Sequence, residues 1–420
     1  MKLELPRGMR DIQPSEHNEI EFIREKFIQI VKKFNFQLMD PSPIEMLSTL
    51  SAKGGPAIIA DTYNFVDKGG RHIALRFDYT VGLSRYVSTR RDLKFPAKLA
   101  SFGGVWRYDE PQMGRYRYFH QWDIEIFGSK NIEADIVVIE LVALFLKSLG
   151  LDVIIEINHK GILEDFISNN LNIVDQNIKE ELFRAVDKTS KKQSNEIMKE
   201  YDGKLNLHDL SRVIDFSKFS GYPDDLSDET VLKSDSWKEL TQIFYSLKER
   251  NLENIRINFG IVRGLDYYSG MVFEARDPKL NIGSLVGGGR YDKLTEIFGR
   301  ADVGAIGAAG GIERIVIAMK QNPTIINKSS SVIYVVHSSG FRQEALKMVT
   351  FLRNNGFSVD YDINDRNVNK QIIDSAQKGA SILIVINEHI TNDEIILKYK
   401  NSERSIRVLD LVRDIKSILK

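Results

Sequence analysis

Three short stretches of the sequence concentrate arginine, carboxylate and tyrosine side chains on segments that otherwise read as strands. They are LRFDYT (75–80), WRYDEPQMGRYRYFHQWDIE (106–125) and RGLDYYSG (263–270). Arginine is a permanent, fork-shaped cation suited to phosphate or carboxylate oxygens, whereas the oxygens of Asp, Glu and Gln accept hydrogen bonds from a protonated amine. A site with cations at one end and acceptors at the other fits a zwitterionic amino acid beside a nucleotide phosphate.

Eight residues of these stretches are the candidate binding residues. They are Asp78, Thr80, Arg107, Gln121, Glu125, Arg263, Tyr267 and Tyr268. Alternate residues of a strand point to the same face, so Gln121, Asp123 and Glu125 are expected to share one face. Tyr267 and Tyr268 then face opposite ways, and we expect Tyr268 to meet the ligand with Tyr267 packed behind it. One such charge alone is better explained as a rim salt bridge, but three clusters together favour a site.

A fourth cluster is rich in glycine: GSLVGGGRYDKL (283–294) followed by VGAIGAAGGIERIVIAM (303–319). Glycine lets a backbone approach a ligand closely, and the apolar helix predicted next carries Arg314 near its start. No Gly-Lys-Ser/Thr follows, so this is not a Walker A loop, and the glycine spacing does not match the dinucleotide-binding fingerprint. Phosphate binding and a glycine-rich strand packed against a helix both remain open on these residues alone.

Composition bounds the remaining possibilities. Lys plus Arg and Asp plus Glu both number 58, so the net charge is zero and any nucleic-acid partner must meet a localised basic surface. The absence of cysteine excludes disulfides, thiolate nucleophiles and Cys-ligated zinc, and the seven histidines lack metal-ligand spacing, so no metal site built from Cys or His is predicted. No apolar run approaches a membrane span, and a cytoplasmic location without membrane contact is the expectation.

The predicted elements place these stretches in a strand-rich region between helices. Apolar residues at a helical period mark a helix from about 20 to 34, and residues 133–149 form a strongly apolar helix that should end at Gly150. Strands are predicted at DIEIFG (123–128) and DVIIEIN (152–158). Residues 165–250 are richer in lysine, asparagine and serine, and we interpret them as an inserted helical module.

The C-terminal part alternates short strands with helices beyond a segment of linker composition at 321–331. Strands are predicted at VIYVVH, FSVDYDI and SILIVIN, with helices between them, and RSIRVLDLVRDIKSIL is predicted to close the chain as a helix. Alternation of this kind predicts a small mixed or parallel sheet covered on both faces.

The motifs resemble those of class II aminoacyl-tRNA synthetases. FGGVWRYDEPQMGRYRYFHQWDIEIFG (102–128) looks like motif 2 of that class, and VGAIGAAGGIERIVIAM looks like motif 3. RGLDYYSG, LRFDYT and PRGMRDIQP (6–14) are similar to signatures of its histidyl-tRNA synthetase family, and the RGLDYY row is the sharpest of these signals. The likeness runs from near the N-terminus through the C-terminal α/β segment.

The resemblance implies a specific architecture. It is an α+β catalytic domain (1–325) with a class II synthetase-type antiparallel sheet flanked by helices and a helical insertion at about 165–250, then a linker (321–331) and a C-terminal α/β anticodon-binding domain (332–420). The insertion would lean on the acceptor arm of tRNA(His). A homodimer is also implied, with helix 20–34 and the following strand near the interface.

The resemblance also assigns roles by motif position. The histidine-binding residues would be Asp78, Thr80, Gln121, Glu125, Tyr267 and Tyr268. Among them Asp78, Thr80 and Gln121 would hold the amino group, while Glu125 and Tyr268 would address the imidazole, whose nitrogens offer both a donor and an acceptor.

ATP and Mg²⁺ would meet the arginines. Arg107 would bind the α-phosphate, Arg314 the γ-phosphate and adenine, and Arg263 would lie between the histidine carboxylate and the α-phosphate. The carboxylate attacks the α-phosphate and releases pyrophosphate, while Arg107 and Arg263, the catalytic residues, stabilise the phosphoryl charge together with Mg²⁺. The terminal ribose hydroxyl of tRNA then attacks the adenylate carbonyl.

Some positions depart from the family pattern. Residues 109–111 read Asp-Glu-Pro where many members carry Glu-Arg-Pro, and Tyr118 stands where glutamate or glutamine is usual. These positions lie in or near the loop expected to touch the tRNA acceptor end. Gln112, Arg115 and Arg117 are the candidates for that contact, although Arg115 and Arg117 could equally stabilise the loop.

Two other functions compete with this one. A synthetase-like regulatory subunit of histidine metabolism would bind histidine or a partner enzyme without charging tRNA, but such paralogues usually lack catalytic-row residues and the anticodon-binding domain, which are present here. A nucleotide-dependent oxidoreductase is disfavoured by the missing dinucleotide fingerprint.

Overall fold

A computed structural model describes most of the chain, in two compact units, Met1–Ile325 and Ile326–Lys420. The described residues are 3–52, 57–110, 116–189, 192–262, 268–280, 282–321, 332–400 and 402–419. Within them no helix is both long enough and apolar enough to cross a membrane. The predicted linker, 321–331, lies outside the described residues except for its first position.

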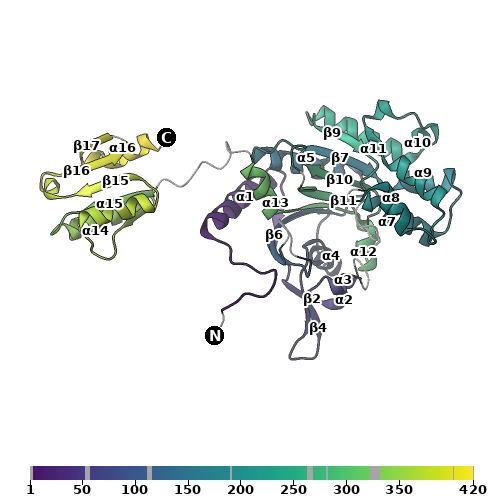
Figure 1. The fold of residues 1–420 in the computed structure, drawn as a ribbon, viewed down its shortest axis with the longest axis horizontal. Coiled ribbons are helices and arrows are strands. Elements are labelled where there is room, and N and C mark those ends of the chain that lie inside the picture. Colours follow the sequence, from purple (N-terminus) through teal and green to yellow (C-terminus); the bar gives the residue numbers. More distant parts are fainter. Residues whose placement is uncertain are drawn as a thin grey trace. The chain divides into compact units, whose positions relative to one another are not determined.

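The centre of unit 1 is a mixed sheet, which the described residues trace as nine strands (Figure 1). Their order across the sheet is β1 (Gln37–Leu38), β5 (Ala97–Trp106), β6 (Tyr118–Phe127), β12 (Ala305–Gly311), β11 (Val286–Arg290), β10 (Met271–Arg276), β7 (Ile154–His159), β9 (Ile255–Asn258) and β8 (Ser220–Gly221). Neighbours from β5 to β7 are antiparallel, whereas β1 pairs with β5, and β7 with β9, in parallel.

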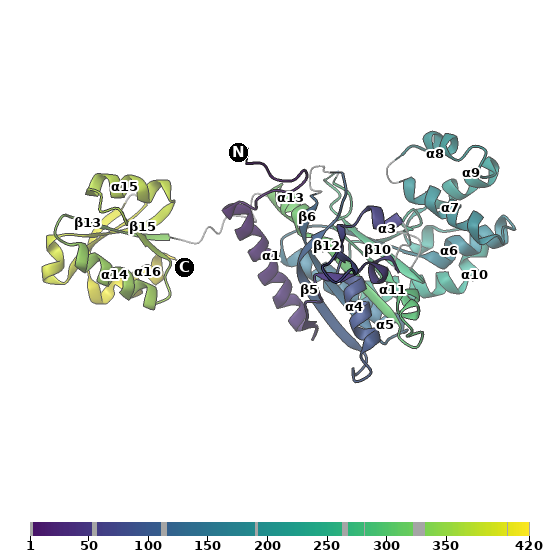
Figure 2. The same cartoon turned by 90° about the horizontal axis from the view of Figure 1, so that it is seen from below.

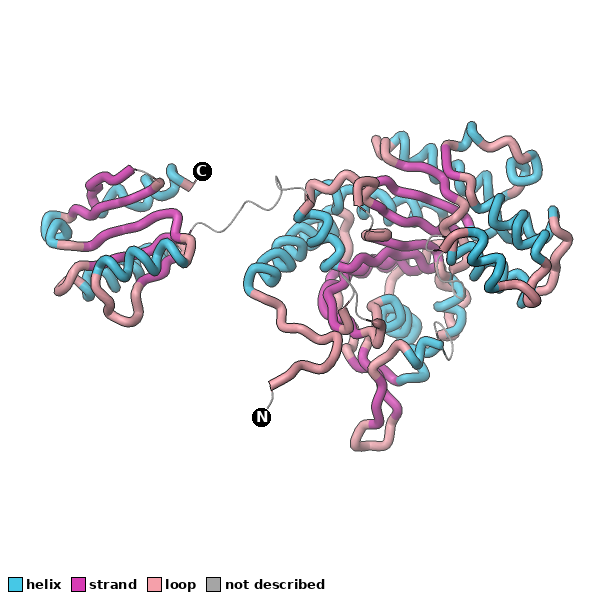
Figure 3. Tube along the Cα trace, viewed as in Figure 1, coloured by secondary structure: helices cyan, strands magenta, loops and turns pink. Residues whose placement is uncertain are grey.

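One face of this sheet packs against helices. These are α1 (Pro14–Lys33), α5 (Ile132–Ser148), α11 (Asp235–Glu249) and α13 (Ile312–Lys320). The apolar period of α1 buries Phe27 against Trp122 of β6, with ring centroids 5.6 Å apart. Helix α5 ends as predicted, because Gly150 has a φ of +74° and its N–H closes the last turn on the Lys147 carbonyl. Figure 3 shows helices packed along the strands of the large sheet.

The opposite face carries α4 (Thr80–Thr89) and α12 (Asp292–Ile297), and here one prediction is wrong. The stretch LRFDYT is not a strand throughout: β4 (His72–Leu75) ends at Leu75, and Thr80 begins α4. Asp78 accepts a hydrogen bond from the Val81 N–H at 3.3 Å, in the first helical turn. Burial of Leu83 and Val87 outweighs the weak helix propensity of this β-branched segment.

Short elements complete the rim of this face. Strand β4 pairs with β2 (Ile44–Met46) on one side and with β3 (Asn64–Val66) on the other, in a small antiparallel sheet. Two short helices, α2 (Leu47–Ser51) and α3 (Ala57–Ala60), lie between β2 and β3 in sequence.

Between β7 and β9 the chain forms a helical module with its own apolar core (Figure 2). Its helices before α11 are α6 (Lys160–Asp165), α7 (Gln176–Lys188), α8 (Ser194–Glu200), α9 (Leu207–Ser217) and α10 (Glu229–Lys233). Two short helical turns, η1 (Phe166–Asn170) and η2 (Pro223–Asp225), join them. Leu182, Phe183 and Leu210 are almost fully buried between α7 and α9.

Unit 2 is a second α/β sheet with helices on both faces. Its strand order is β14 (Val359–Tyr361), β13 (Val332–His337), β15 (Ala380–Ile386), β16 (Glu394–Tyr399) and β17 (Ser402–Arg407). β14, β13 and β15 pair in parallel, whereas β15 pairs with β16, and β16 with β17, in the antiparallel sense. The helices are α14 (Arg342–Asn354), α15 (Val368–Gln377) and α16 (Leu411–Ile418).

The predicted terminal helix over RSIRVLDLVRDIKSIL is wrong in its first part. Residues 404–407 belong to β17, and the helix begins only at Leu411, after the turn η4 (Val408–Asp410). Ile406 packs into the core and pairs with Ile395 of β16, a strand the sequence analysis did not predict. Long-range pairing overrides local helical periodicity here. The predicted α+β architecture with a C-terminal α/β domain is confirmed.

Candidate active site

A cavity of about 450 Å³ opens on the sheet face opposite α1 and α5. Seven of the predicted site residues line it: Asp78, Thr80, Arg107, Gln121, Glu125, Tyr268 and Arg314. They come from four separate parts of the chain, and the sheet brings them together. Arg263, Tyr267, Gln112 and Arg115 lie outside the described residues, so their roles stay predictions.

Strand β6 supplies the acceptors because alternate residues face the cavity. Trp122 and Ile124 point into the core beneath, whereas Gln121 and Glu125 point outward, as predicted. Asp123 shares their face but is fully buried, and its Oδ2 lies 3.5 Å from both Gln121 Nε2 and Thr80 Oγ1. Asp123 therefore orients the two polar groups that line the cavity.

Arg107 is held in place before any ligand arrives. Its Nε donates to the Phe77 carbonyl at 3.0 Å, and its Nη2 donates to Gln121 Oε1 at 3.3 Å. The guanidinium also lies 5.2 Å from the centroid of the Phe119 ring. Fixing a cation by its Nε and one Nη leaves a planar fork with known direction, which suits recognition of a phosphate or carboxylate.

Glu125 is the most constrained acid of the cavity. It is 1% exposed, and its Oε2 accepts a hydrogen bond from the Tyr291 hydroxyl at 2.5 Å. Burial, together with this carboxylate, raises the pKa of Tyr291 well above its usual value, so the phenol keeps its proton and donates it. Opposite Glu125 on β12 stands Gly307, where a Cβ would lie 1.5 Å from the same Oε2.

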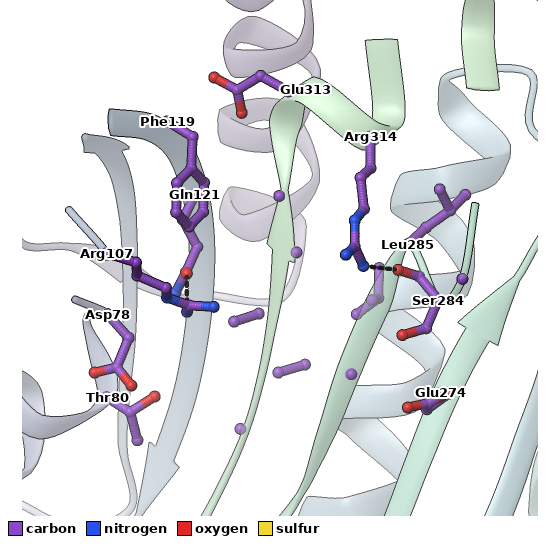
Figure 4. A pocket seen from close by; sticks show the side chains of 18 of the residues that line it. Asp78, Thr80, Arg107, Phe119, Gln121, Glu274, Ser284, Leu285, Glu313 and Arg314 are labelled. Atoms are coloured by element: carbon purple, nitrogen blue, oxygen red, sulfur yellow. Dashed lines mark hydrogen bonds between the residues drawn. The ribbon is translucent and has the colours of Figure 1, made fainter. Parts of the chain in front are cut away.

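The far side of the cavity is formed by β10, β11 and the start of α13 (Figure 4). Arg314 reaches in from α13 and donates through Nη1 to the Ser284 carbonyl at 3.0 Å. Beside it on β10, Arg276 pairs with Glu274 at 2.5 Å. Figure 4 shows Arg107 and Arg314 on opposite sides of the cavity, with β12 between them.

Several lining residues were not predicted as site residues. Those with charged or phenolic side chains are Asp109, Tyr116, Asp187, Glu274, Arg276, Tyr291 and Glu313. Tyr291 and Glu313 belong to the glycine-rich stretches already singled out, and their polar character inside apolar sequence was the available signal. Asp187 lies on α7 of the helical module and reaches the cavity only through the fold, so no local pattern could identify it.

Arg117 lies within the described residues, and its guanidinium already contacts other parts of the chain. It is 8% exposed and donates to the carbonyls of Asp109 at 3.2 Å and Arg7 at 3.1 Å. Its guanidinium also stacks 3.9 Å from the centroid of the Tyr108 ring. This geometry favours the loop-stabilising alternative for Arg117 over contact with tRNA.

Comparison with known proteins identifies the relatives of this chain. A family model described as histidyl-tRNA synthetase matches residues 8–315, and a model described as anticodon binding domain matches residues 327–411. The histidine–tRNA ligase of Sulfurisphaera tokodaii is 31% identical over 412 residues, 96% of this chain and 95% of that protein. The histidine–tRNA ligase of Methanococcus maripaludis is 31% identical over 417 residues, 98% of this chain and 99% of that protein.

Solved structures share the fold at lower identity. The histidyl-tRNA synthetase from Nostoc sp. PCC 7120 matches with a TM-score of 0.84 and 23% identity over 100% of both chains. A Bacillus halodurans protein described as an ATP phosphoribosyltransferase regulatory subunit/histidyl-tRNA synthetase matches with a TM-score of 0.73 and 22% identity, over 92% of this chain and 99% of that one. At these identities the likeness speaks for the fold alone.

Proposed function

Because this chain belongs to the histidyl-tRNA synthetase family and is a histidine–tRNA ligase, we propose which side chains of the cavity carry out each part of the reaction. The observation that carries the proposal is the convergence of amine acceptors, a fixed imidazole acceptor and two guanidinium groups on one cavity. Histidine is activated with ATP to histidyl-adenylate, and the histidyl group is then transferred to the 3′ end of tRNA(His).

Histidine lies along β6 in this proposal. Asp78, Thr80 and Gln121 hold its ammonium group, and Asp123 fixes the last two. Glu125 lies four residues further along the strand, about 13 Å at the usual rise per residue, so it addresses the other end of the substrate. There it receives the imidazole N–H, while the hydroxyl of Tyr268, with Tyr267 behind it, meets the second ring nitrogen.

ATP occupies the part of the cavity between Arg107 and Arg314. The fit rests on the floor, where the partly exposed lining residues Gly287, Ala309 and Gly311 carry little or no side chain and leave room for a planar base. Arg107 binds the α-phosphate, and Arg314 binds the γ-phosphate and stacks on the adenine. Arg107→Lys keeps the charge but loses the planar fork, and a large fall in adenylate formation is the expected result.

The charges of the cavity are compatible with Mg²⁺ bound on ATP. The described lining contains six acids, Asp78, Asp109, Glu125, Asp187, Glu274 and Glu313, and three arginines, Arg107, Arg276 and Arg314. A triphosphate entering this field needs further cations, which Arg263 and Mg²⁺ supply. The described residues contain no group of three or more potential ligands, which suits an ion held by one or two carboxylates and by phosphates. Glu274 is the carboxylate we propose for it.

Adenylate formation then needs positioning and charge stabilisation but no covalent nucleophile. The histidine carboxylate attacks the α-phosphorus in line with the departing pyrophosphate, and Arg107 and Arg263 stabilise the phosphoryl oxygens as negative charge grows on them. The hydrogen bonds that hold Arg107 to Phe77 and Gln121 fix its direction beforehand, so little reorganisation is required during the reaction.

The remaining parts of the chain serve tRNA(His) in this proposal. Unit 1 is the catalytic domain, its helical module at about 165–250 leans on the acceptor arm, and Gln112 and Arg115 meet the acceptor end. The α/β unit beyond the linker binds the anticodon, in line with its family match. The reaction takes place in the cytoplasm.

A homodimer is part of the proposal as well. Apolar side chains stand exposed on β1 at the sheet edge and on β2 and β3 of the small sheet: Leu38, Ile44, Met46, Phe65 and Val66. Burial of exposed apolar side chains is a common reason for self-association. Light scattering coupled to size exclusion should give twice the chain mass of 48.0 kDa, and a charged residue at Val66 should lower it.

One assay set tests the function as a whole. ATP–pyrophosphate exchange is measured with each of the twenty amino acids, followed by charging of tRNA(His). Exchange with histidine alone, and charging, are the expected results. Exchange with a different amino acid would overturn the assignment of the acceptors to imidazole. Absence of both activities would favour the regulatory-subunit alternative, which the likeness of fold alone does not distinguish.

A further inference from the structure

We propose that Arg10, in the N-terminal segment, is a positioning residue for ATP. It lies behind the cavity wall and acts through two lining residues, Tyr116 and Glu313, which it fixes in position and in charge. The inference rests on the proposed function, because it assigns the adjoining end of the cavity to ATP.

The Arg10 guanidinium joins three parts of the chain that are far apart in sequence. Both of its Nη atoms donate to Glu16 at the start of α1, each at 2.5 Å. Nη2 also lies 3.6 Å from Oε1 of Glu313 on α13. The guanidinium carbon is 3.9 Å from the centroid of the ring of Tyr116, which lies two residues before β6 begins. A planar cation stacked on a ring and paired at its edge is held in one orientation.

Two of the three residues that Arg10 touches, Tyr116 and Glu313, line the cavity. Glu313 is 5% exposed, and its carboxylate accepts the His120 N–H at 3.0 and 3.2 Å. It immediately precedes Arg314, the residue proposed to bind the γ-phosphate and adenine. A buried carboxylate at this position would repel a triphosphate, and Arg10, which it shares with Glu16, is the arginine that lies against it and offsets its charge.

The N-terminal segment is built to hold Arg10 there. Residues 6–9 form a tight turn closed by the Met9 N–H and the Pro6 carbonyl at 3.0 Å, with Gly8 at a φ of +81°. The Gly8 carbonyl accepts the Arg117 N–H at 3.1 Å, which extends the pairing of β6 onto this turn. A Cβ at Gly8 would lie 2.6 Å from Arg117 Cδ, so the turn docks too closely for any other residue.

The prediction separates the two substrates of adenylate formation. Arg10→Ala should raise the KM for ATP in histidine-dependent pyrophosphate exchange by about tenfold or more, while the KM for histidine stays within about twofold. A merely structural role would lower the amount of active protein and change neither KM selectively. Arg10→Lys keeps the charge without the fork and should give an intermediate ATP KM. It also serves as the second variant, should Arg10→Ala fold poorly.

Two further variants sharpen the test. The double variant Arg10→Ala with Glu313→Gln removes the negative charge that Arg10 would otherwise compensate. The amide oxygen of Gln at position 313 can still accept the His120 N–H. Much of the ATP affinity should therefore return. Arg71→Ala is the matched control, because Arg71 forms an exposed pair with Asp67 on the β3–β4 hairpin. It should leave both KM values unchanged.

The outcomes are distinguishable. If the unsubstituted chain lacks histidine-dependent exchange, the proposed function fails and this inference fails with it. If exchange is normal and Arg10→Ala or Arg10→Lys leaves the ATP KM unchanged, or raises both KM values equally, the inference alone is refuted. No recovery in the double variant refutes charge compensation as the cause.

Discussion

Replacing Tyr291 by phenylalanine removes a single oxygen, the donor that fixes Glu125. The ring is 2% exposed and the change adds no volume, so its main effect is the loss of the hydrogen bond to a buried carboxylate, together with the contact of the hydroxyl with Ser84. Hydrogen bonds to charged groups contribute about 1.5–3 kcal/mol, and the free energy of unfolding of unit 1 should fall by that amount. Histidine binding must then also order the freed Glu125 side chain, at about 0.5–1.5 kcal/mol, which raises the KM for histidine about two- to tenfold.

The chain offers a clean assay for this prediction. All three tryptophans, Trp106, Trp122 and Trp237, lie in unit 1, so their fluorescence during urea unfolding reports that unit alone. Pyrophosphate exchange gives the KM for histidine and the KM for ATP, and the latter should not change. Tyr245→Phe is the control, because that ring is 47% exposed. An unfolding free energy within about 0.5 kcal/mol of the parent and an unchanged histidine KM would contradict the role assigned to Tyr291.

Three more predictions follow from the described contacts and the motif roles. Gly307→Ala places a Cβ where the Glu125 carboxylate lies and should lower histidine-dependent exchange about 100-fold or more, whereas Gly311→Ala meets nothing within 4 Å and should leave the unfolding curve unchanged. The pKa of Asp374 is lowered by hydrogen bonds from Tyr334, Lys378 and Arg366. The contribution of Asp374 to stability is therefore present above its unfolded pKa, about 4, and is lost as the pH falls below that value. Pulse-labelled hydrogen exchange of peptides from β13 and α15 should show this loss of stability in the parent protein. The loss should be smaller in Asp374→Asn. Arg263→Ala should nearly abolish adenylate formation with the unfolding curve retained, and near-normal exchange would refute the catalytic role assigned by motif position.

Local sequence predicted those elements whose burial follows a simple period. Helix α1 was predictable because one side of it enters the core and the other does not. Strand β6 was predictable because polar and apolar residues alternate along it, although both of its faces are buried. The segment from Thr80 and the strand β17 were not, because the residues that decide their conformation are distant: the core behind Leu83, and the pairing of Ile406 with β16. Propensity is a weak guide wherever tertiary contacts supply most of the stability.

The residues of the cavity also differ in how far the sequence alone could identify them. Residue type and spacing identified several groups that line the cavity, such as Gln121 and Arg107, because their chemistry is visible in the sequence. They did not identify Tyr291 or Asp187, which act through a partner or a neighbouring element that only folding provides. The glycines of β12 left two alternatives open, and the structure shows why: Gly307 lies in a strand packed beside a helix and also leaves the space that Glu125 occupies.

The floor of small residues between β11 and β12 has a consequence for inhibitor design. A planar compound that lies flat on Gly287 and Ala309 would pack against main-chain atoms common to every residue type, which no point substitution can delete. A larger side chain could only cover them, and it would narrow the part of the cavity in which ATP is proposed to bind. Drug resistance should therefore arise at the rim, at positions such as Tyr116, and selectivity between organisms should be sought there as well.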